Sequence, residues 1–299
     1  MKQPAQGRIN ERITAIGTAL YPTYVVRGET KNLMIDAGIN LMAPHYLAAL
    51  RDVTHDEAGL DCLFLTHSHY DHIGAASYIR QHIPGLKIGA HESLAGLLQK
   101  PSVLETMNRL SANHVDLLEY NVHNEDLVLR PFEIDLALKQ GDEFDLGGLT
   151  CHVYETPGHT RDSLAFYFPE IGALFPGEAC GLAQDEREGE VQVEFLASYQ
   201  EYLDSLERLS ALRPQLICLG HGQVLTQDDA VEFLSRSHVE TSRYRELIEG
   251  HLDAAAGDVD EAIRAMAHAE YDVKGGIRQE RTAYLINLTA QIKHIAGLR

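Results

Sequence analysis

The sequence predicts a layered α/β body with a helical cap at its C-terminal end. Short apolar runs typical of strands alternate with helical patterns over residues 1–227, whereas the pattern over 228–299 is helical only. In addition, metal-ligating side chains repeatedly follow directly after an apolar run. Strands interspersed with helices are typical of layered α/β folds, in which sites are built where strands end. We therefore expect one domain over 1–227 and a helical extension over 228–299 that packs on it.

The first 90 residues predict an alternation of strands and helices. Glycines at 17, 28 and 38 punctuate the first three apolar runs. A Pro-Gly pair at 84–85 stops the second helix. The predicted strands are 12–16, 24–27, 32–36, 60–66 and 86–90, and the predicted helices are 43–53 and 73–82.

A helical insert interrupts this alternation at about 92–130. Apolar residues recur at helical spacing over 102–118, and Pro101 suits a first helical turn. Strand patterns then return, and they enclose an amphipathic helix over 199–209. The later strands are expected at 149–154, 163–168, 172–175 and 215–219, and the terminal helices at 228–252, 258–271 and 277–298.

Composition and charge argue against several classes of protein. The 299 residues include 25 Lys and Arg against 44 Asp and Glu, so the formal net charge is −19. Binding to a phosphate backbone needs a basic face, and we expect no nucleic-acid partner. The sequence shows no signal-peptide pattern and no apolar stretch long enough for a membrane span. The four cysteines form no CxxC pair, as in reduced core thiols, and we expect a cytoplasmic protein.

The most informative segment is Thr66–Gly74, which reads THSHYDHIG and follows an apolar run. In an extended loop, residues two apart point the same way, so His67 and His69 can converge on one ion. Asp71 and His72 stand where a helix is expected to begin, and their side chains can address a second ion. Imidazoles with a carboxylate suit zinc, iron or manganese. A polar surface loop is the competing interpretation, which the flanking strand disfavours.

Three further candidates follow the same pattern. His159 stands in TPGHT, Glu178 in FPGEA and His221 in LGHG, each directly after an apolar run. Taken singly, each would more often be a solvated loop residue than a ligand. Together they share a position where a strand ends, and in layered α/β folds such positions form the rim of a site.

With these residues in view, the chain resembles the metallo-β-lactamase-fold hydrolase superfamily. The motifs extend over roughly residues 12–222 and occur in the family's order. The resemblance implies an αββα sandwich with a dinuclear metal site where the sheets end. The implied ligands are His67, His69 and His159 for the first metal, Asp71, His72 and His221 for the second, and Glu178 as the bridge between them.

The bridge departs from the family's pattern, which has Asp after the glycine where Glu178 follows Gly177. The longer side chain requires the backbone to sit back or the carboxylate to bind in another mode, so we expect altered metal choice or a weakened second site. Within the superfamily, the chain is similar to the thioesterase-like response proteins of alkylquinolone signalling. The shared features are total length, the HSHYDH loop, a helix at Tyr202–Leu209 and the helical C-terminal extension.

The resemblance implies metal-dependent hydrolysis of a thioester, a lactone or a related activated ester. Two divalent metal ions would supply a hydroxide nucleophile, with zinc expected rather than iron or manganese. Asp71 would orient this hydroxide and accept its proton. Asp36 resembles the buried acid that supports the family's ligands, with a plain turn residue as the competing view. The expected partner is a small-molecule substrate, an acyl or aromatic ester or thioester, and the terminal helices favour a homodimer.

Other interpretations stay open. The chain could be a non-catalytic or regulatory metal-binding protein of the same fold, or an iron-dependent redox enzyme. A glyoxalase-II-like thioesterase would need basic residues in the C-terminal helices, where solvated charges explain the arginines more simply. Tyr70 either packs against the metal loop or reaches the substrate. His91 and His114 border the insert and are candidates for lining a pocket.

Overall fold

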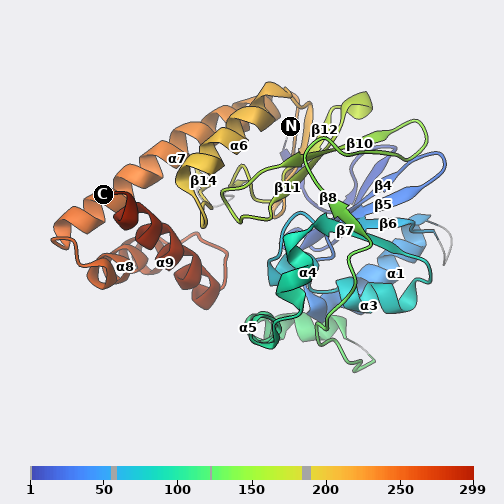
Figure 1. The fold of residues 1–299 in the computed structure, drawn as a ribbon, viewed down its shortest axis with the longest axis horizontal. Coiled ribbons are helices and arrows are strands. Elements are labelled where there is room, and N and C mark those ends of the chain that lie inside the picture. Colours follow the sequence, from blue (N-terminus) through green and yellow to red (C-terminus); the bar gives the residue numbers. More distant parts are fainter. Residues whose placement is uncertain (1, 55–58, 122, 184–189) are drawn as a thin grey trace.

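The structure is a computed structural model that describes residues 2–54, 59–121, 123–183 and 190–299. In this part of the chain, two seven-stranded mixed sheets pack face to face, and helices cover the outer face of each (Figure 1). The predicted α/β class, an αββα sandwich with further helices at the C-terminal end, is confirmed.

The first sheet is antiparallel in its first half and parallel in its second. In spatial order it contains β2 (Gly7–Arg8), β3 (Ile13–Gly17), β4 (Pro22–Arg27), β5 (Asn32–Ile35), β6 (Cys62–Phe64), β7 (Lys87–His91) and β8 (Leu136–Leu138).

The second sheet has one parallel pair, β12 with β15, among antiparallel neighbours. In spatial order it contains β1 (Lys2–Pro4), β16 (Gln223–Thr226), β15 (Leu216–Cys218), β12 (Ala173–Phe175), β11 (Leu164–Phe168), β10 (Thr150–Glu155) and β9 (Glu143–Asp145). A separate hairpin pairs β13 (Leu182–Ala183) with β14 (Val191–Gln192).

Helices occupy the outer layers, the insert and the C-terminal end. The α-helices are α1 (Ala43–Thr54), α2 (Tyr70–Ile73), α3 (Ala76–His82), α4 (Ser93–Leu98), α5 (Pro101–Ser111), α6 (Tyr199–Ala211), α7 (Asp228–Ala254), α8 (Val259–Ala267) and α9 (Arg281–Leu298). Short 3-10 helices lie at Asn40–Met42, Val115–Tyr120 and Pro169–Ile171, and a π-helix at His268–Val273. Among the described residues, every helix is too short or too polar to cross a membrane.

Alternating strand residues build three apolar layers. In β4, Val25 faces the cluster under α1 and α3, and its neighbour Val26 faces the opposite sheet. In β11, Ala165 faces α6 and α7, and Phe166 faces inward. Successive side chains of a strand point to opposite faces, so each sheet contributes to a central core and to one outer core.

Several elements differ from their predicted form. The helix predicted at 73–82 is interrupted, because α2 ends at Ile73 and α3 begins at Ala76. Gly74 lies between them in close contact with the 3-10 helix, where an added Cβ would lie 2.5 Å from the backbone nitrogen of Asn40. The insert helix ends at Ser111, seven residues before its predicted end at 118. The last helix begins at Arg281, where Glu280 caps the N–H groups of Thr282 and Ala283. The strands of two or three residues at the sheet edges, and β16, were outside the prediction.

The C-terminal helices form a lobe beside the sandwich (Figure 1). Helix α7 packs along α6 and β16, and α8 and α9 share a fourth apolar cluster with the segment that leads into α6. Phe195 from that segment and Tyr202 of α6 lie in the same cluster as Ile292 and Leu288 of α9. The domain boundary at 227 stays a prediction, since one continuous cluster crosses it.

Candidate metal centre

All seven predicted ligands lie together where the two sheets end. Each is in a loop or short helix that follows the carboxyl end of a strand, namely β6, β10, β12 or β15. The side chains form two groups of potential ligands, His67, His69, His159 and Glu178 in one and Asp71, His72 and His221 in the other. Backbone contacts hold the loops in register, including the bond from the Leu164 N–H to the Thr66 carbonyl at 2.7 Å.

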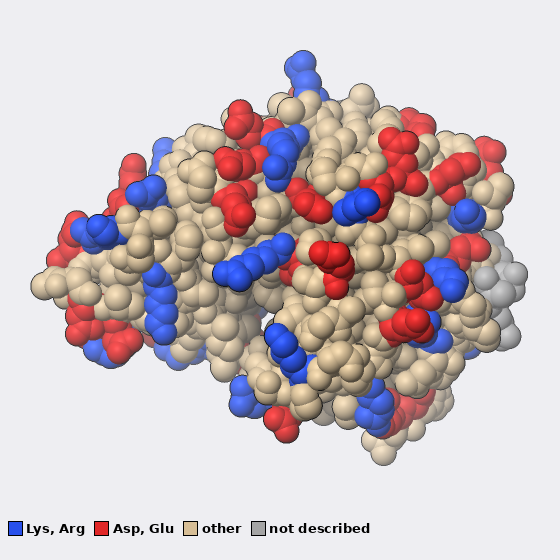
Figure 2. Space-filling model, viewed as in Figure 1, with Lys and Arg blue, Asp and Glu red and all other residues tan. Residues whose placement is uncertain are grey.

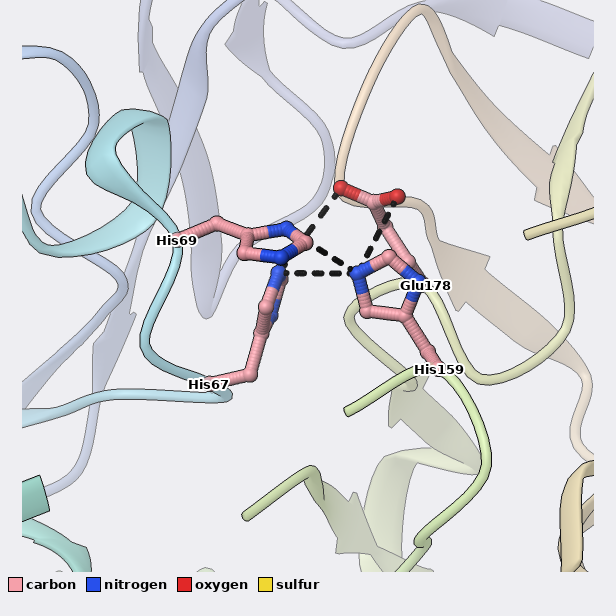
Figure 3. Close-up of side chains that lie close together, drawn as sticks. All are labelled: His67, His69, His159 and Glu178. Carbon is pink, nitrogen blue, oxygen red and sulfur yellow. Dashed lines mark hydrogen bonds and ion pairs between the residues drawn. The ribbon is translucent and has the colours of Figure 1, made fainter. Parts of the chain in front are cut away.

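The first cluster brings three imidazoles together (Figure 3). The Nε2 atom of His159 lies 3.2 Å from Nε2 of His67 and 3.1 Å from Nδ1 of His69. His67 and His69 come from one loop, and their side chains converge on His159, as the spacing predicts. His159 approaches from the second sheet, so the cluster spans both halves of the sandwich.

The second cluster lies beside the first. The Nε2 atoms of His72 and His221 are 3.2 Å apart, and the Asp71 carboxylate lies 3.5 Å from Nε2 of His221. Asp71 and His72 lie on α2, the short helix that follows the extended loop of His67 and His69. His67 and His72 have ring centroids 4.1 Å apart, so the two clusters are adjacent.

Glu178 contacts both clusters. Its Oε1 atom lies 3.1 Å from Nε2 of His72 and 3.3 Å from Nε2 of His221, whereas its Oε2 atom lies 3.5 Å from Nε2 of His159. An added Cβ on Gly177, whose φ is 55°, would lie 2.9 Å from the Thr66 side chain, so this loop is tightly packed.

Four of the five imidazoles have one nitrogen that faces away from the centre, and the hydrogen bond of that nitrogen decides whether the nitrogen facing the centre carries a lone pair. The Nδ1 atom of His72 lies 2.8 Å from the Asp36 carboxylate, which leaves Nε2 as the lone-pair nitrogen. The Thr66 hydroxyl donates to Asp36 and therefore accepts from Nδ1 of His67, at 3.0 Å. The interpretation of Asp36 as a supporting acid thus fits its contacts better than a plain turn residue does.

Two more of the five imidazoles follow the same rule through backbone carbonyls. His159 donates from Nδ1 to the carbonyl of Glu194 at 2.6 Å, and His221 donates from Nδ1 to the carbonyl of Leu20. Four lone-pair nitrogens therefore converge with two carboxylates in a buried space. Such a donor set fits divalent cations, because these lone pairs would otherwise face one another without a shared proton or ion.

Burial and mutual charge shape the protonation of the centre. Burial, together with the neighbouring imidazoles, lowers the pKa of His67 well below its ordinary value and that of His159 to about 4. Burial opposes the charged form of His72, yet Asp36 and Glu178 raise its pKa well above the ordinary value. Without a metal ion, the acids thus favour a proton on Nε2 of His72 as well, at the position where a bound cation would replace that proton.

Two cavities open onto the centre. The larger encloses about 430 Å³ between α5 and α9 and is mostly apolar. The smaller encloses about 60 Å³ and is lined partly by polar side chains. Tyr70, Asp71, Glu178 and Gln279 border both. The side chains lining the larger cavity from α5 and α9 include Val103, Met107, Leu110, Ala283 and Ile286.

The other histidines and the arginines considered in the sequence analysis have different relations to these cavities. His91 and His114 are not among the described residues that line either one, and His114 lies behind the wall, against Tyr21 and Tyr70. Arg278 borders the smaller cavity. Three other C-terminal arginines pair with acids, Arg243 with Glu240 and Arg245 with Glu249 within α7, and Arg281 of α9 with Asp272 of the π-helix.

Sequence reasoning missed Glu194. Its side chain is buried, and its carboxylate is within hydrogen-bonding distance of Gln192 and Asn287. Burial and the nearby Glu178 raise the pKa of Glu194 to about 8. It contacts His159 through its backbone carbonyl, so the residue type carries no signal of that role.

Comparison with known proteins agrees with this geometry. A model of the Metallo-beta-lactamase superfamily matches residues 20–221, a region that contains all seven predicted ligands. The chain is 30% identical over 206 residues to the beta-lactamase-like protein 2 homolog of Drosophila melanogaster, covering 69% of this chain and 59% of that protein. It is 28% identical over 168 residues to a hydroxyacylglutathione hydrolase of Ruegeria pomeroyi, covering 54% and 48%. It therefore spans less than two thirds of these two relatives.

Solved structures share the fold. A metallo-beta-lactamase family protein from Thermus thermophilus, TTHA1429, superposes with a TM-score of 0.65 at 18% identity, over 99% of this chain and 93% of that one. The archaeal protein ST1585 from Sulfolobus tokodaii gives a TM-score of 0.55 at 21% identity, over 79% and 86%. The first of these superpositions includes the C-terminal helices as well as the sandwich.

Proposed function

Because the chain belongs to the metallo-β-lactamase superfamily, we propose that it is a metal-dependent hydrolase that cleaves a thioester, a lactone or another activated ester. One observation supports the proposal above all. Five imidazoles and two carboxylates converge on two adjacent points in a buried space that opens into a substrate-sized cavity. Zinc, iron and manganese all suit this donor set, with zinc preferred for its affinity for imidazole.

When bound, two divalent cations would supply Lewis acidity and a hydroxide nucleophile at neutral pH. His67, His69 and His159 would hold one ion. Asp71, His72 and His221 would hold the other, and Glu178 would contact both. Asp71 borders both cavities, so its carboxylate can orient the nucleophile and accept its proton as it attacks a carbonyl carbon. The chain needs no serine or cysteine nucleophile for this chemistry.

The cavities favour a substrate with one apolar arm. A space of about 430 Å³ lies within the range of pockets that hold drug-sized groups, and its apolar lining suits an acyl chain or an aromatic ring. The hydroxyacylglutathione hydrolases among the relatives are named for a thioester substrate, which supports the thioester part of the proposal. Kinship with the alkylquinolone response proteins is a finer proposal of the same kind.

The remaining partner predictions are kept as proposals. On the face shown in Figure 2, Lys and Arg side chains lie scattered among Asp and Glu, a pattern that supports a small-molecule substrate better than a nucleic acid. The same view shows a notch between the C-terminal lobe and the rest of the molecule. The cytoplasmic location and the homodimer remain predictions of the sequence.

The proposal is tested with protein reconstituted separately with zinc, iron(II) and manganese. Turnover is measured on acetyl, octanoyl and benzoyl thioesters and on lactones, together with metal content by elemental analysis. We expect turnover with at least one metal, and loss of both metal and turnover in His67→Ala. His91→Ala, which removes an imidazole away from the cavities, serves as the matched control. Absence of turnover with both clusters loaded would count against hydrolysis and favour a regulatory metal-binding protein.

A further inference from the structure

Two tyrosines beside the metal centre share one histidine. The hydroxyl of Tyr21 lies 3.1 Å from Nδ1 of His114, and the hydroxyl of Tyr70 lies 3.1 Å from Nε2 of the same ring. All three side chains are buried, with exposed fractions of 6%, 9% and 9% for Tyr21, Tyr70 and His114. Tyr21 directly precedes β4, Tyr70 begins α2 after the metal loop, and His114 lies in the insert, so the cluster joins three segments that are far apart in the sequence.

Counting protons shows that one hydroxyl hydrogen is left over. Burial lowers the pKa of His114, so its ring is neutral and carries one N–H donor and one acceptor nitrogen. One tyrosine therefore donates to the ring, and the other accepts from it. Within the described residues, His114 is the only hydrogen-bond partner of either hydroxyl. The accepting tyrosine thus keeps an O–H hydrogen that points to no protein acceptor.

Both tyrosines border the smaller cavity, and Tyr70 alone also borders the larger one. Glu280 borders the smaller cavity too, but its carboxylate is bound by the N–H groups of Thr282 and Ala283 at the start of α9 and by Asn113. A space of about 60 Å³ holds about four water molecules, so it suits the polar end of a ligand rather than an apolar arm.

We propose that Tyr70 is a substrate-binding hydrogen-bond donor whose hydroxyl contacts the leaving sulfur or oxygen atom, with His114 and Tyr21 as positioning residues. The proposal rests on the proposed hydrolysis. The acyl arm occupies the larger cavity, so the bond to be broken lies at the junction of the two cavities. Tyr70 and Asp71 stand at that junction, next to each other in the chain.

The contribution of Tyr70 is a hydrogen bond and leaves its own proton in place. Hydroxide adds to the carbonyl carbon, the bond from that carbon to sulfur or oxygen breaks, and its electron pair goes to the leaving atom. The hydrogen of the attacking hydroxide ends on the leaving group, so the products are a carboxylate and a thiol or alcohol. Negative charge grows on the leaving atom during this step, and a donor aimed at that atom stabilises it.

The test is a series of benzoyl thioesters whose aryl thiols differ in acidity. Wild type, Tyr70→Phe and Tyr21→Phe are compared by kcat/KM across the series, at equal metal content. Without its donor, the enzyme should suffer most with the least acidic thiol. We expect about a tenfold loss there for Tyr70→Phe and a much smaller loss with the most acidic thiol. Tyr78→Phe removes a hydroxyl that binds Glu125 away from the cavities and is the matched control.

A second measurement does not depend on turnover. Nitrogen-15 NMR of labelled histidine, assigned with a His114→Gln variant, reports which ring nitrogen carries the proton. We expect a neutral ring protonated on Nε2, the nitrogen that faces Tyr70. A ring protonated on Nδ1 or on both nitrogens would overturn the inference, as would equal losses across the thiol series for Tyr70→Phe. Absence of wild-type turnover would instead count against the proposed hydrolysis, and the NMR result would still decide the proton arrangement.

Discussion

The Nδ1 atom of His72 lies 2.8 Å from Oδ2 of Asp36, and this contact decides which nitrogen of His72 faces the metal centre. Asp36 also accepts the backbone N–H of Thr66 at 2.8 Å and its hydroxyl at 2.9 Å. Its φ of 60° lies in the left-handed region, which Asn adopts as readily as Asp. An amide can therefore replace the carboxylate without a change in the backbone.

Asp36→Asn should weaken metal binding at the second cluster. The new amide can still accept from Thr66, but its NH₂ group then faces the Nδ1–H of His72. His72 must take the other tautomer, which places a proton on Nε2 where the lone pair is needed. Loss of a supporting carboxylate typically costs about 10- to 100-fold in metal affinity. Zinc titration against a competing chelator measures the effect.

The matched control for this change is Asp61→Asn. Asp61 accepts the backbone N–H of Asn32 at 2.8 Å, at the opposite end of β5 and β6 from the metal loop. It should retain the wild-type affinity. Unchanged affinity in Asp36→Asn would show that His72 keeps its tautomer without the carboxylate.

Glu178→Asp should weaken the bridge between the clusters, although Asp is the family's usual residue. The shorter side chain withdraws the carboxylate by about 1.5 Å. The backbone cannot follow, because Gly177 is packed against Thr66 and the Glu178 carbonyl accepts from the Tyr202 hydroxyl. We expect lower occupancy of the second cluster and lower activity. Elemental analysis and turnover measure both, with Glu178→Gln as the variant of unchanged length. A gain in metal content would instead support a site weakened by Glu178.

Gly158→Ala should disturb the loop that carries His159. Gly158 has a φ of 135°, and an added Cβ would lie 2.3 Å from the Cα atom of Tyr202. The carbonyl of Gly158 also accepts from the N–H of Ser198, so the loop and the start of α6 are fixed together. We expect about 2–4 kcal/mol lower stability, from backbone strain and displaced packing, and less metal at the first cluster.

Gly96→Ala is the control for this glycine. Gly96 lies within α4, and nothing is within 4 Å of an added Cβ. Because glycine in a helix costs about 0.5–1 kcal/mol relative to alanine, this change should be neutral or stabilising. Denaturant unfolding of both variants separates the two effects. Equal stability of Gly158→Ala and wild type would mean that the loop can move without cost.

Met107→Trp tests the larger cavity as the acyl pocket. Met107 lines this cavity from α5, and the indole would fill part of its 430 Å³. Activity on an octanoyl thioester should fall at least tenfold relative to an acetyl thioester, because each buried methylene contributes about 0.8 kcal/mol. Val115→Trp adds the same ring at an exposed position of the insert and should leave this ratio unchanged. Equal losses on both substrates would place the acyl group elsewhere.

The candidate ligands were predictable because their residue types follow apolar strands. The packing of the two sheets then brings them together, since His67 follows a strand of the first sheet and His159 follows a strand of the second. The role of His114 was less accessible. It lies 93 residues from Tyr21 in the sequence, and only the packing of the insert places it behind Tyr70. Glu194 supports His159 through a carbonyl that every residue possesses. Strands of two residues, such as β13 and β14, are too short to show a period.

Asp135→Asn should destabilise the protein in a pH-dependent way. Asp135 accepts from Arg80, Lys87 and the N–H of Ile88, at 2.5, 3.1 and 2.9 Å. Burial opposes its charge, yet these donors lower the pKa of its carboxyl well below 3.8. The stabilisation is therefore present above about pH 4 and is lost as the pH falls toward the folded-state pKa. Asp135→Asn should cost about 2 kcal/mol at pH 7, and the difference from wild type should shrink below pH 4.

Urea unfolding from pH 2.5 to 7 tests this prediction. Asp253→Asn, which removes the charge from an exposed ion pair with Arg299, is the near-neutral control. A deficit independent of pH would mean that packing, and not the charge, makes Asp135 stabilising.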